Sequence, residues 1–256
     1  MNSTILRDIL QMGTRNHSYL SRFEKSIEAF DLRYLPHFQP PRWMIRKADK
    51  AHVFISHFMD RMIFPIYDSH GSLVSVAGRR VTDDRLRPKY YNTNFAKSKY
   101  LFCHPQFWKE THKEIWVVEG YGSVIRAWEM GHHNVCATMG TSVSDSHIAM
   151  LTSFEVPIHF VYDGDKPGQD ATARIPNVSF GTTDLFVRPL QWGYDLDDFL
   201  LEFGRVPDPV PYGRWWANFK WKQIRDIDDK DEKARLIQEF VVESANRKLT
   251  KHLQAI

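Results

Sequence analysis

The chain has 256 residues, of which 43% are hydrophobic and 25% are charged, so it can bury a sizeable core and is not a disordered segment. Its formal net charge of +3 excludes a protein that binds nucleic acid through overall charge alone, but it leaves room for a local basic surface. Two cysteines cannot form a four-thiolate zinc site, and no apolar run approaches the ~18 residues that span a membrane. We therefore expect a cytoplasmic protein with no signal peptide and no membrane association.

The first part of the chain mixes helical and strand patterns. Residues 18–30, SYLSRFEKSIEAF, predict a helix. Residues 61–81 predict two short strands joined by a turn at residues 68–71, with alternating side chains after the turn. These patterns indicate an α+β subdomain.

From about residue 112 to 205, short apolar strands alternate with helical stretches. The strands are predicted at residues 115–118, 134–138, 158–163 and 184–190. Strands that alternate with helices form βαβ units, which build a mostly parallel sheet. The sequence therefore predicts a chain of the α/β class.

The last part of the chain is predicted to be a small helical tail. Residues from 229 onwards carry strong helix formers at helical periodicity. Residues 211–222 interleave aromatic with basic side chains, which suits either single-strand binding or the packing of a helical cap, and we expect packing. We divide the chain into subdomains 1–110 and 111–205 and a tail, 206–256.

The small net charge conceals an asymmetry along the chain. Residues 41–100 hold twelve Lys or Arg against five Asp, whereas residues 161–200 hold seven Asp against three Lys or Arg. A basic region beside an acidic one suits a site that holds a polyanion against divalent cations. The alternative is a pair of solvated surfaces with opposite charge.

Five carboxylates follow the ends of predicted strands. Glu119 follows the first strand, Asp163 ends the third, and Asp165 comes one glycine later; Asp195 and Asp197 lie beyond the fourth. Ligands of a parallel sheet gather at the carboxyl ends of its strands, so we expect these side chains to share one pocket. Clustered carboxylates repel one another unless a cation lies among them, and Mg²⁺ prefers oxygen ligands. Their joint order predicts a metal site, although each motif alone is commonly a turn or a helix start.

The same residues carry a resemblance to a known family. The order VVEGYGSVI, ATMGTS, FVYDGDKPGQDA and GYDLDDFL resembles the Toprim domain of DnaG-type bacterial and phage primases. Upstream, FPIYDSHGSLVSVAGRR and RPKYYNTNFAKS are similar to the N-terminal polymerase subdomain of these primases, and SYLSRFEKSIEAFDLRY resembles the helical segment that leads into it. The resemblance covers residues 18–205. It implies a Rossmann-like Toprim subdomain beside the α+β subdomain, with the active site in the cleft between them.

The resemblance also implies an activity and the residues that perform it. The activity is template-directed synthesis of short RNA primers on single-stranded DNA from nucleoside triphosphates, by nucleotidyl transfer that depends on Mg²⁺ or Mn²⁺. The metal-binding carboxylates that it implies are Glu119, Asp163, Asp165, Asp195 and Asp197, the first three of them catalytic. The nucleotide- and nucleic-acid-binding residues that it implies are Arg79 or Arg80, Lys89, Asn92 and Lys97.

The sequence departs from the family pattern in three places. Ser123 stands where the family usually has an aspartate. No C-x₂-C pair marks the family's zinc-binding module, so no zinc is expected in this chain. No phosphate-binding motif of a helicase is present either. We expect a minimal primase core of a phage or other mobile element, with a separate zinc-binding protein and a replicative helicase as partners.

Two other functions stay open at the level of sequence. A Toprim nuclease would cut phosphodiesters with the same metal ligands, but the upstream block at residues 64–98 argues against it. A non-catalytic accessory protein would bind single strands or a helicase, and Ser123 together with the missing zinc module keeps that alternative open.

Overall fold

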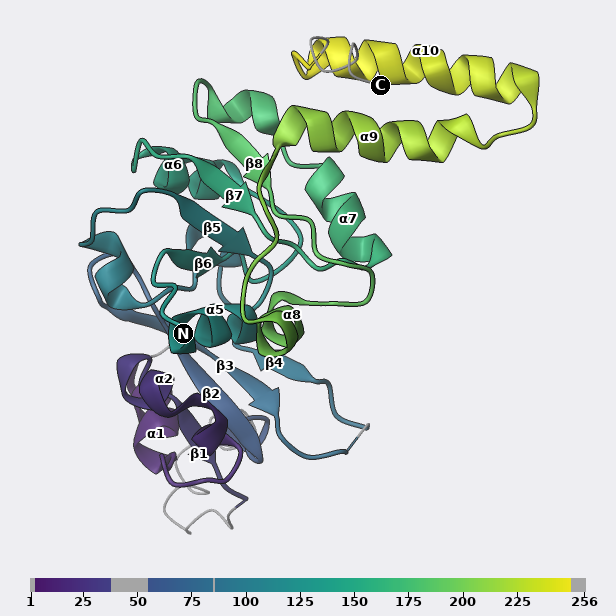
Figure 1. The fold of residues 1–256 in the computed structure, drawn as a ribbon. Coiled ribbons are helices and arrows are strands. Elements are labelled where there is room, and N and C mark those ends of the chain that lie inside the picture. Colours follow the sequence, from purple (N-terminus) through teal and green to yellow (C-terminus); the bar gives the residue numbers. More distant parts are fainter. Residues whose placement is uncertain (1–2, 38–54, 85, 250–256) are drawn as a thin grey trace.

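The computed structural model describes residues 3–37, 55–84 and 86–249, which form two sheets with helices around them (Figure 1). The first sheet has four strands in the order β1-β2-β3-β4, and every neighbouring pair is antiparallel. Its strands are β1 (Arg33–Leu35), β2 (Arg61–Tyr67), β3 (Leu73–Arg80) and β4 (Tyr90–Asn92). The turn predicted between β2 and β3 is present, and Asp68 Oδ1 closes it by accepting hydrogen bonds from the backbone N–H groups of His70 and Ser72.

Helices at the start of the chain cover this first sheet. They are α1 (Ser3–Met12), the 3₁₀ turn η1 (Leu20–Phe23) and α2 (Glu24–Ala29). The helix predicted over residues 18–30 therefore begins as a 3₁₀ turn and continues as α2. No helix was predicted for residues 3–12, yet α1 buries Leu6 and Ile9 in a cluster with residues of β2 and β3.

The second sheet has five strands in the order β6-β5-β7-β8-β9. They are β5 (Ile115–Val118), β6 (Val135–Ala137), β7 (Ile158–Phe160), β8 (Leu185–Val187) and β9 (Val210–Pro211). The four predicted strands are all present and parallel, and β9 adds an antiparallel edge. The helices between them are α5 (Tyr121–Glu129), α6 (Asp145–Thr152), α7 (Lys166–Ala173) and α8 (Leu196–Phe203). Shorter 3₁₀ turns are η2 (Lys97–Lys99), η3 (Pro105–Trp108) and η4 (Asn177–Phe180). The predicted α/β class is confirmed.

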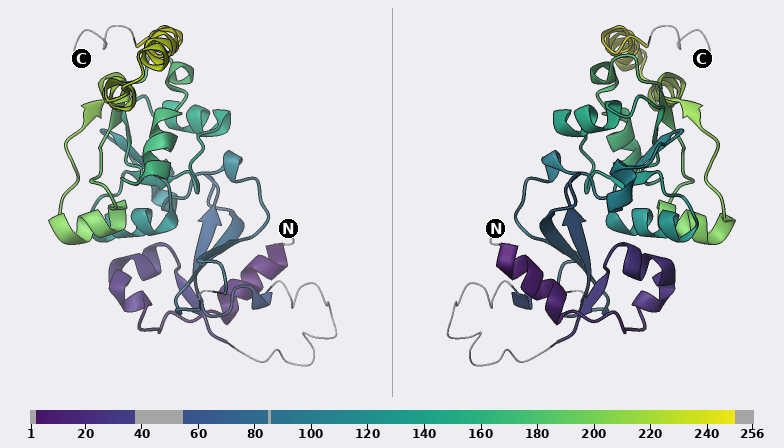
Figure 2. Two further views of the ribbon diagram at one scale, coloured as in Figure 1. Left: turned by 90° about the vertical axis from the view of Figure 1, so that its right-hand side faces the viewer. Right: turned by 90° about the vertical axis from the view of Figure 1, so that its left-hand side faces the viewer.

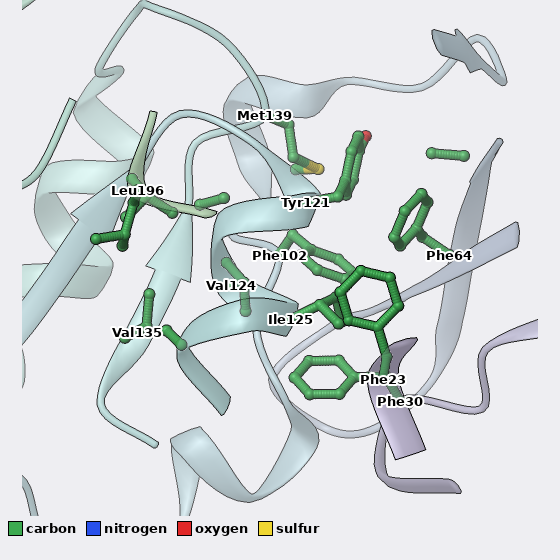
Figure 3. Close-up of a cluster of buried hydrophobic side chains, with 14 of the residues drawn as sticks. Phe23, Phe30, Phe64, Phe102, Tyr121, Val124, Ile125, Val135, Met139 and Leu196 are labelled. Atoms are coloured by element: carbon green, nitrogen blue, oxygen red, sulfur yellow. The ribbon is translucent and has the colours of Figure 1, made fainter. Parts of the chain in front are cut away.

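Helix α5 packs against both sheets. Figure 3 shows Tyr121 and Ile125 of this helix among Phe64 of β2, Phe102 and Phe30. The rings of Tyr121 and Phe64 stack with their centroids 5.1 Å apart. The same buried cluster contains side chains of β5 and β6. One hydrophobic core therefore joins the two sheets and fixes the position of one against the other.

Residues 212–246 form a helical hairpin at the end of the molecule opposite α1 and α2 (Figure 2). Its helices are α9 (Tyr212–Arg225) and α10 (Lys230–Asn246). Trp216 is completely buried, and its ring stacks on Phe240 with centroids 5.6 Å apart. The expected packing role is therefore confirmed for Trp216. No helix formed by the described residues is long and apolar enough to cross a membrane.

Candidate functional site

A cavity of about 280 Å³ lies between the two sheets, at the carboxyl ends of β5, β6 and β7. Eight of the predicted site residues line it: Arg79, Lys89, Asn92, Lys97, Glu119, Asp163, Asp195 and Asp197. Basic residues come from the first sheet and the segment after it, and the carboxylates come from the second sheet. Segments far apart in the sequence thus converge on one pocket, as expected from the strand ends for all of the predicted carboxylates except Asp165.

Strand pairing places Glu119 beside Asp163. The two residues follow β5 and β7, which pair in parallel with Val117 opposite Phe160. Glu119 Oε1 accepts a hydrogen bond from the backbone N–H of Asp163 at 3.2 Å. This hydrogen bond engages one of the two carboxylate oxygens of Glu119.

Gly164 brings the loop that carries Asp195 against the end of β7. Its N–H donates to the carbonyl oxygen of Tyr194 at 2.8 Å. A Cβ at position 164 would lie 2.0 Å from the carbonyl oxygen of Gln191, so only glycine permits this approach. Asp195 is the N-cap residue of α8, and its Oδ1 accepts a hydrogen bond from the backbone N–H of Asp198 at 2.9 Å. The loop contact therefore sets the position of a third carboxylate at the cavity.

The carboxylates of the cavity are held in an environment that disfavours negative charge. Burial, together with the charges of Glu119, Asp195 and Asp165, raises the pKa of Asp163 to about 7. Burial also raises the pKa of Glu119 and that of Asp195. A nearby cation stabilises the charged form of such carboxylates.

Two predicted ligands have local partners. Asp165 is exposed and caps α7, where its Oδ1 accepts from Gly168 N–H at 2.9 Å, and it does not line the cavity. Asp197 lines the cavity, but its Oδ1 lies 2.6 Å from Nε of Arg126, a buried residue of α5. The charge of Asp165 therefore helps to raise the pKa of Asp163 in the cavity. The Asp197 carboxylate, which lines the cavity, is already paired with Arg126.

The donor set fits a hard divalent cation. Among the residues described by the structure, no three Asp, Glu, His or Cys side chains already converge closely enough to hold a metal ion. Glu119, Asp163 and Asp195 nevertheless present carboxylate oxygens to one cavity, with pKa values raised by burial and mutual repulsion. Oxygen donors and uncompensated negative charge are what Mg²⁺ and similar ions bind.

Cationic and polar side chains form the opposite wall of the cavity. The Arg79 guanidinium lies 5.9 Å from the ring centroid of Tyr90, and Lys89 Nζ lies 6.0 Å from the same centroid. Asn92 Oδ1 accepts from the Tyr121 hydroxyl at 2.6 Å, which fixes the direction of its amide group. Burial lowers the pKa of Lys97. This wall suits the phosphates of a nucleotide or a nucleic acid.

Arg80 lies away from the cavity. Its guanidinium donates to the backbone carbonyl of Thr82 at 2.9 Å and to those of Asp84 and Arg87. These bonds tie together the loop that follows β3. Of the Arg79 and Arg80 pair, the structure therefore brings only Arg79 to the site.

Several cavity residues were not predicted from the sequence. Met139 and Gly140 follow β6 and line the cavity, and the strand-end rule that selected Glu119 would also have selected them. Tyr90 and Tyr121 line it as well. The pairing of Arg126 with Asp197 was not predicted either, because an isolated arginine in a helical stretch is usually exposed to solvent.

Comparison with known families gives two adjoining matches. Residues 18–107 match the family described as "DNA primase catalytic core, N-terminal domain", and residues 116–200 match the family described as "Toprim-like". Among curated proteins, a DNA primase of Aquifex aeolicus is 29% identical in a gapped alignment of 203 positions, which covers 71% of this chain and 40% of the relative. A DNA primase of Halalkalibacterium halodurans is 27% identical in a gapped alignment of 286 positions, which covers 96% of this chain and 46% of the relative. The chain spans less than half the length of both relatives.

Solved structures share the fold. A DnaG catalytic core superposes with a TM-score of 0.75 at 19% identity, covering 98% of this chain and 97% of the other. A DnaG primase catalytic domain bound to single-stranded DNA gives 0.74 at 20% identity, with coverage of 98% and 93%. The zinc-binding and RNA polymerase domains of the Aquifex aeolicus primase give 0.64 at 22% identity, with coverage of 94% and 71%.

Proposed function

We infer that the chain belongs to the DnaG-type primase family, because it joins a match to the N-terminal domain of the primase catalytic core to a Toprim-like match. From this premise we propose that it synthesises short RNA primers on a single-stranded DNA template from nucleoside triphosphates. The observation that carries the proposal is the single cavity with carboxylates on one wall and Arg79, Lys89 and Lys97 on the other.

The carboxylate wall would hold a divalent cation, Mg²⁺ or Mn²⁺. Glu119, Asp163 and Asp195 are its proposed ligands, and Asp165 and Asp197 add negative charge beside them. A bound cation supplies charge neutralisation for the triphosphate and favours ionisation of the attacking 3′-hydroxyl. Ser123 also lines the cavity, and it contributes a hydroxyl where the family usually has a charge.

The basic wall would align the phosphates. Nucleotidyl transfer needs positioning and charge neutralisation more than covalent help from side chains. Arg79, Lys89 and Lys97 bring three cationic groups to the cavity, and Asn92 brings an oriented amide. No side chain has to act as a covalent nucleophile in this scheme.

Partners follow from the same proposal. The template is single-stranded DNA, which a structural neighbour binds. A zinc-binding module accompanies the RNA polymerase domain of another neighbour, and we propose that a separate protein supplies such a module here. A replicative helicase is the further partner that we expect. The predicted origin in a phage or other mobile element would be checked by the genes around the coding sequence.

The proposal is tested by incubating the protein with labelled nucleoside triphosphates, single-stranded DNA and Mg²⁺ or Mn²⁺. We expect primers from the wild type and a loss of about 100-fold or more in Asp163→Asn and Asp195→Asn, because a metal contributes several kcal/mol to transition-state stabilisation. Asp170→Asn is the matched control, since Asp170 pairs with Lys166 outside the cavity. Shortened DNA would indicate the nuclease alternative. DNA binding without any product would indicate an accessory protein.

A further inference from the structure

Lys97 is carried to the cavity by a short turn that a different part of the chain holds in place. The turn η2 precedes the five-stranded sheet in sequence, but it lies against α6 of that sheet. His147 of α6 is buried, with 1% of its surface exposed, and its Nε2 lies 3.1 Å from the carbonyl oxygen of Lys97 and 2.9 Å from that of Tyr100. The histidine side chain therefore reaches across to the backbone on both sides of the turn.

Ser144 completes this contact and fixes the ring. Its backbone N–H donates to Nδ1 of His147 at 3.4 Å, and its hydroxyl donates to the carbonyl oxygen of Ser98 at 2.6 Å. Because Nδ1 accepts, the ring proton is assigned to Nε2, which can then donate to the two carbonyls. Side chains at the start of α6 thus reach the backbone carbonyls of Lys97, Ser98 and Tyr100.

The Lys97 ammonium depends on this backbone for its position. Within the part of the chain that the structure describes, no carboxylate lies within ion-pair distance of it. The turn itself is closed by the Lys97 N–H bond to Phe95 at 2.9 Å and the Tyr100 N–H bond to Lys97 at 3.0 Å. Those bonds shape the turn but do not attach it to the cavity. Capping of α6 does not require the Nε2 contacts either, because the Ser144 hydroxyl accepts from His147 N–H at 3.1 Å.

We propose that His147, together with Ser144, is a positioning residue that holds the Lys97 turn so that the Lys97 ammonium meets a phosphate group bound in the cavity. This inference rests on the proposed function, because it assigns Lys97 to phosphate. The phosphate belongs either to the DNA strand or to the nucleotide, and the two sources are separated by the choice of probe.

A double-mutant cycle tests the proposal. Equilibrium binding is measured for a fluorescent single-stranded oligonucleotide and for a fluorescent ATP analogue with Mg²⁺, using Lys97→Ala, His147→Ala and the double variant. We expect each single substitution to weaken the binding of one of the two probes by about 10-fold, which is the effect of a misplaced contact. The double variant should bind no more weakly than Lys97→Ala alone.

Further variants separate positioning from stability. Gln at position 147 can present a donor in place of Nε2, so His147→Gln should recover most of the affinity, whereas His147→Phe should behave like His147→Ala. Ser144→Ala, which keeps the ring, should give a smaller loss in the same probe. His112→Ala is the matched control: His112 is buried and contacts the Phe107 carbonyl through Nε2 at 2.9 Å, but it does not line the cavity. The His112→Ala substitution should lower the melting temperature without weakening the binding of either probe.

The outcomes distinguish this inference from the proposed function. Additive losses in the double variant, or wild-type affinity of His147→Ala for both probes, would overturn the positioning role. Unchanged binding by Lys97→Ala would overturn it too. A wild-type protein that binds the probes but makes no primers would instead count against the proposed function, and the binding cycle would still be readable.

Discussion

Arg126 and Asp197, which lines the cavity, form an ion pair with 2.6 Å between Nε and Oδ1 and only 8% and 12% of their side chains exposed. The Arg126 guanidinium also lies 4.8 Å from the ring centroid of Phe23. The pair therefore connects α5, α8 and the segment at η1. It gives Asp197 a compensated charge, in contrast to Asp163.

Breaking this pair from one side should be costly. We expect Arg126→Met or Asp197→Asn alone to lower the free energy of unfolding by about 3–5 kcal/mol, because each leaves a buried charge without its partner. The double variant should lose less than the sum of the single losses. Urea unfolding of the three variants measures the coupling, and strictly additive losses would contradict it.

Gly164 and Gly140 should differ sharply in tolerance of a methyl group. At Gly164 the added Cβ meets a backbone carbonyl at 2.0 Å, whereas at Gly140 it meets nothing within 4 Å. We expect Gly164→Ala to displace the loop that carries Asp195 and to lower both the activity and the melting temperature, whereas Gly140→Ala should keep the wild-type melting temperature. Primer synthesis and the melting temperature of both variants provide the check. Equal behaviour of the two would mean that the loop contact is unimportant.

The raised pKa of Asp163 predicts how stability varies with pH in the presence of a chelator. The folded-state pKa of about 7 lies above the ordinary 3.8, so the folded protein binds this proton more tightly than the unfolded chain does. The stabilising contribution of the proton is complete below about pH 4 and is lost as the pH rises to 7. Asp163→Asn should therefore unfold at a higher temperature than wild type at pH 8 and at the same temperature at pH 4.

The size of this effect is limited by solvent, because Asp163 is only partly buried. A gain on the order of 1 kcal/mol at pH 8 is reasonable after screening, which corresponds to about 2–4 °C. Asp170→Asn again serves as the control, since Asp170 pairs with Lys166. A variant at position 163 that is less stable than wild type at pH 8 would show that burial and repulsion do not act on this carboxyl as described.

Arg79 and Arg80 should have separable effects on binding. Arg79→Ala removes a charged donor from the cavity, so we expect binding of ATP or single-stranded DNA to weaken by about 10-fold or more. If Arg79 contacts DNA, the salt dependence of binding should also fall by about one phosphate contact. Arg80→Ala should leave both quantities near wild type and instead increase proteolysis in the loop after β3. The reverse pattern would exchange the two roles.

The sequence predicted the strands and the convergence of their ends, but it could not resolve neighbouring side chains. Arg79 and Arg80 are adjacent in β3, and successive residues of a strand point to opposite faces, so only one of them faces the cavity. The DGD motif contains one residue that lines the cavity and one that caps a helix, because Asp165 meets the N-terminus of α7. The roles of these residues and the subdomain boundaries at 110/111 and 205/206 stay predictions.

Long-range pairing lay beyond the reach of local patterns. Arg126 and Asp197 are separated by 71 positions, and His147 meets the Lys97 backbone across 50. Neither contact has a spacing that a helix or strand period would reveal. Helix α1 was not predicted, because its amphipathic pattern spans only 10 residues and an irregular segment follows it.

Because α5 shares one hydrophobic core with side chains of both sheets, we expect the two walls of the cavity to keep a fixed position relative to each other. Both walls should consequently unfold in a single cooperative transition. Substrates should enter the cavity without a prior movement of one wall against the other. Two fragments divided near residue 110 would each expose part of the shared hydrophobic core to water, and they should reassociate when mixed.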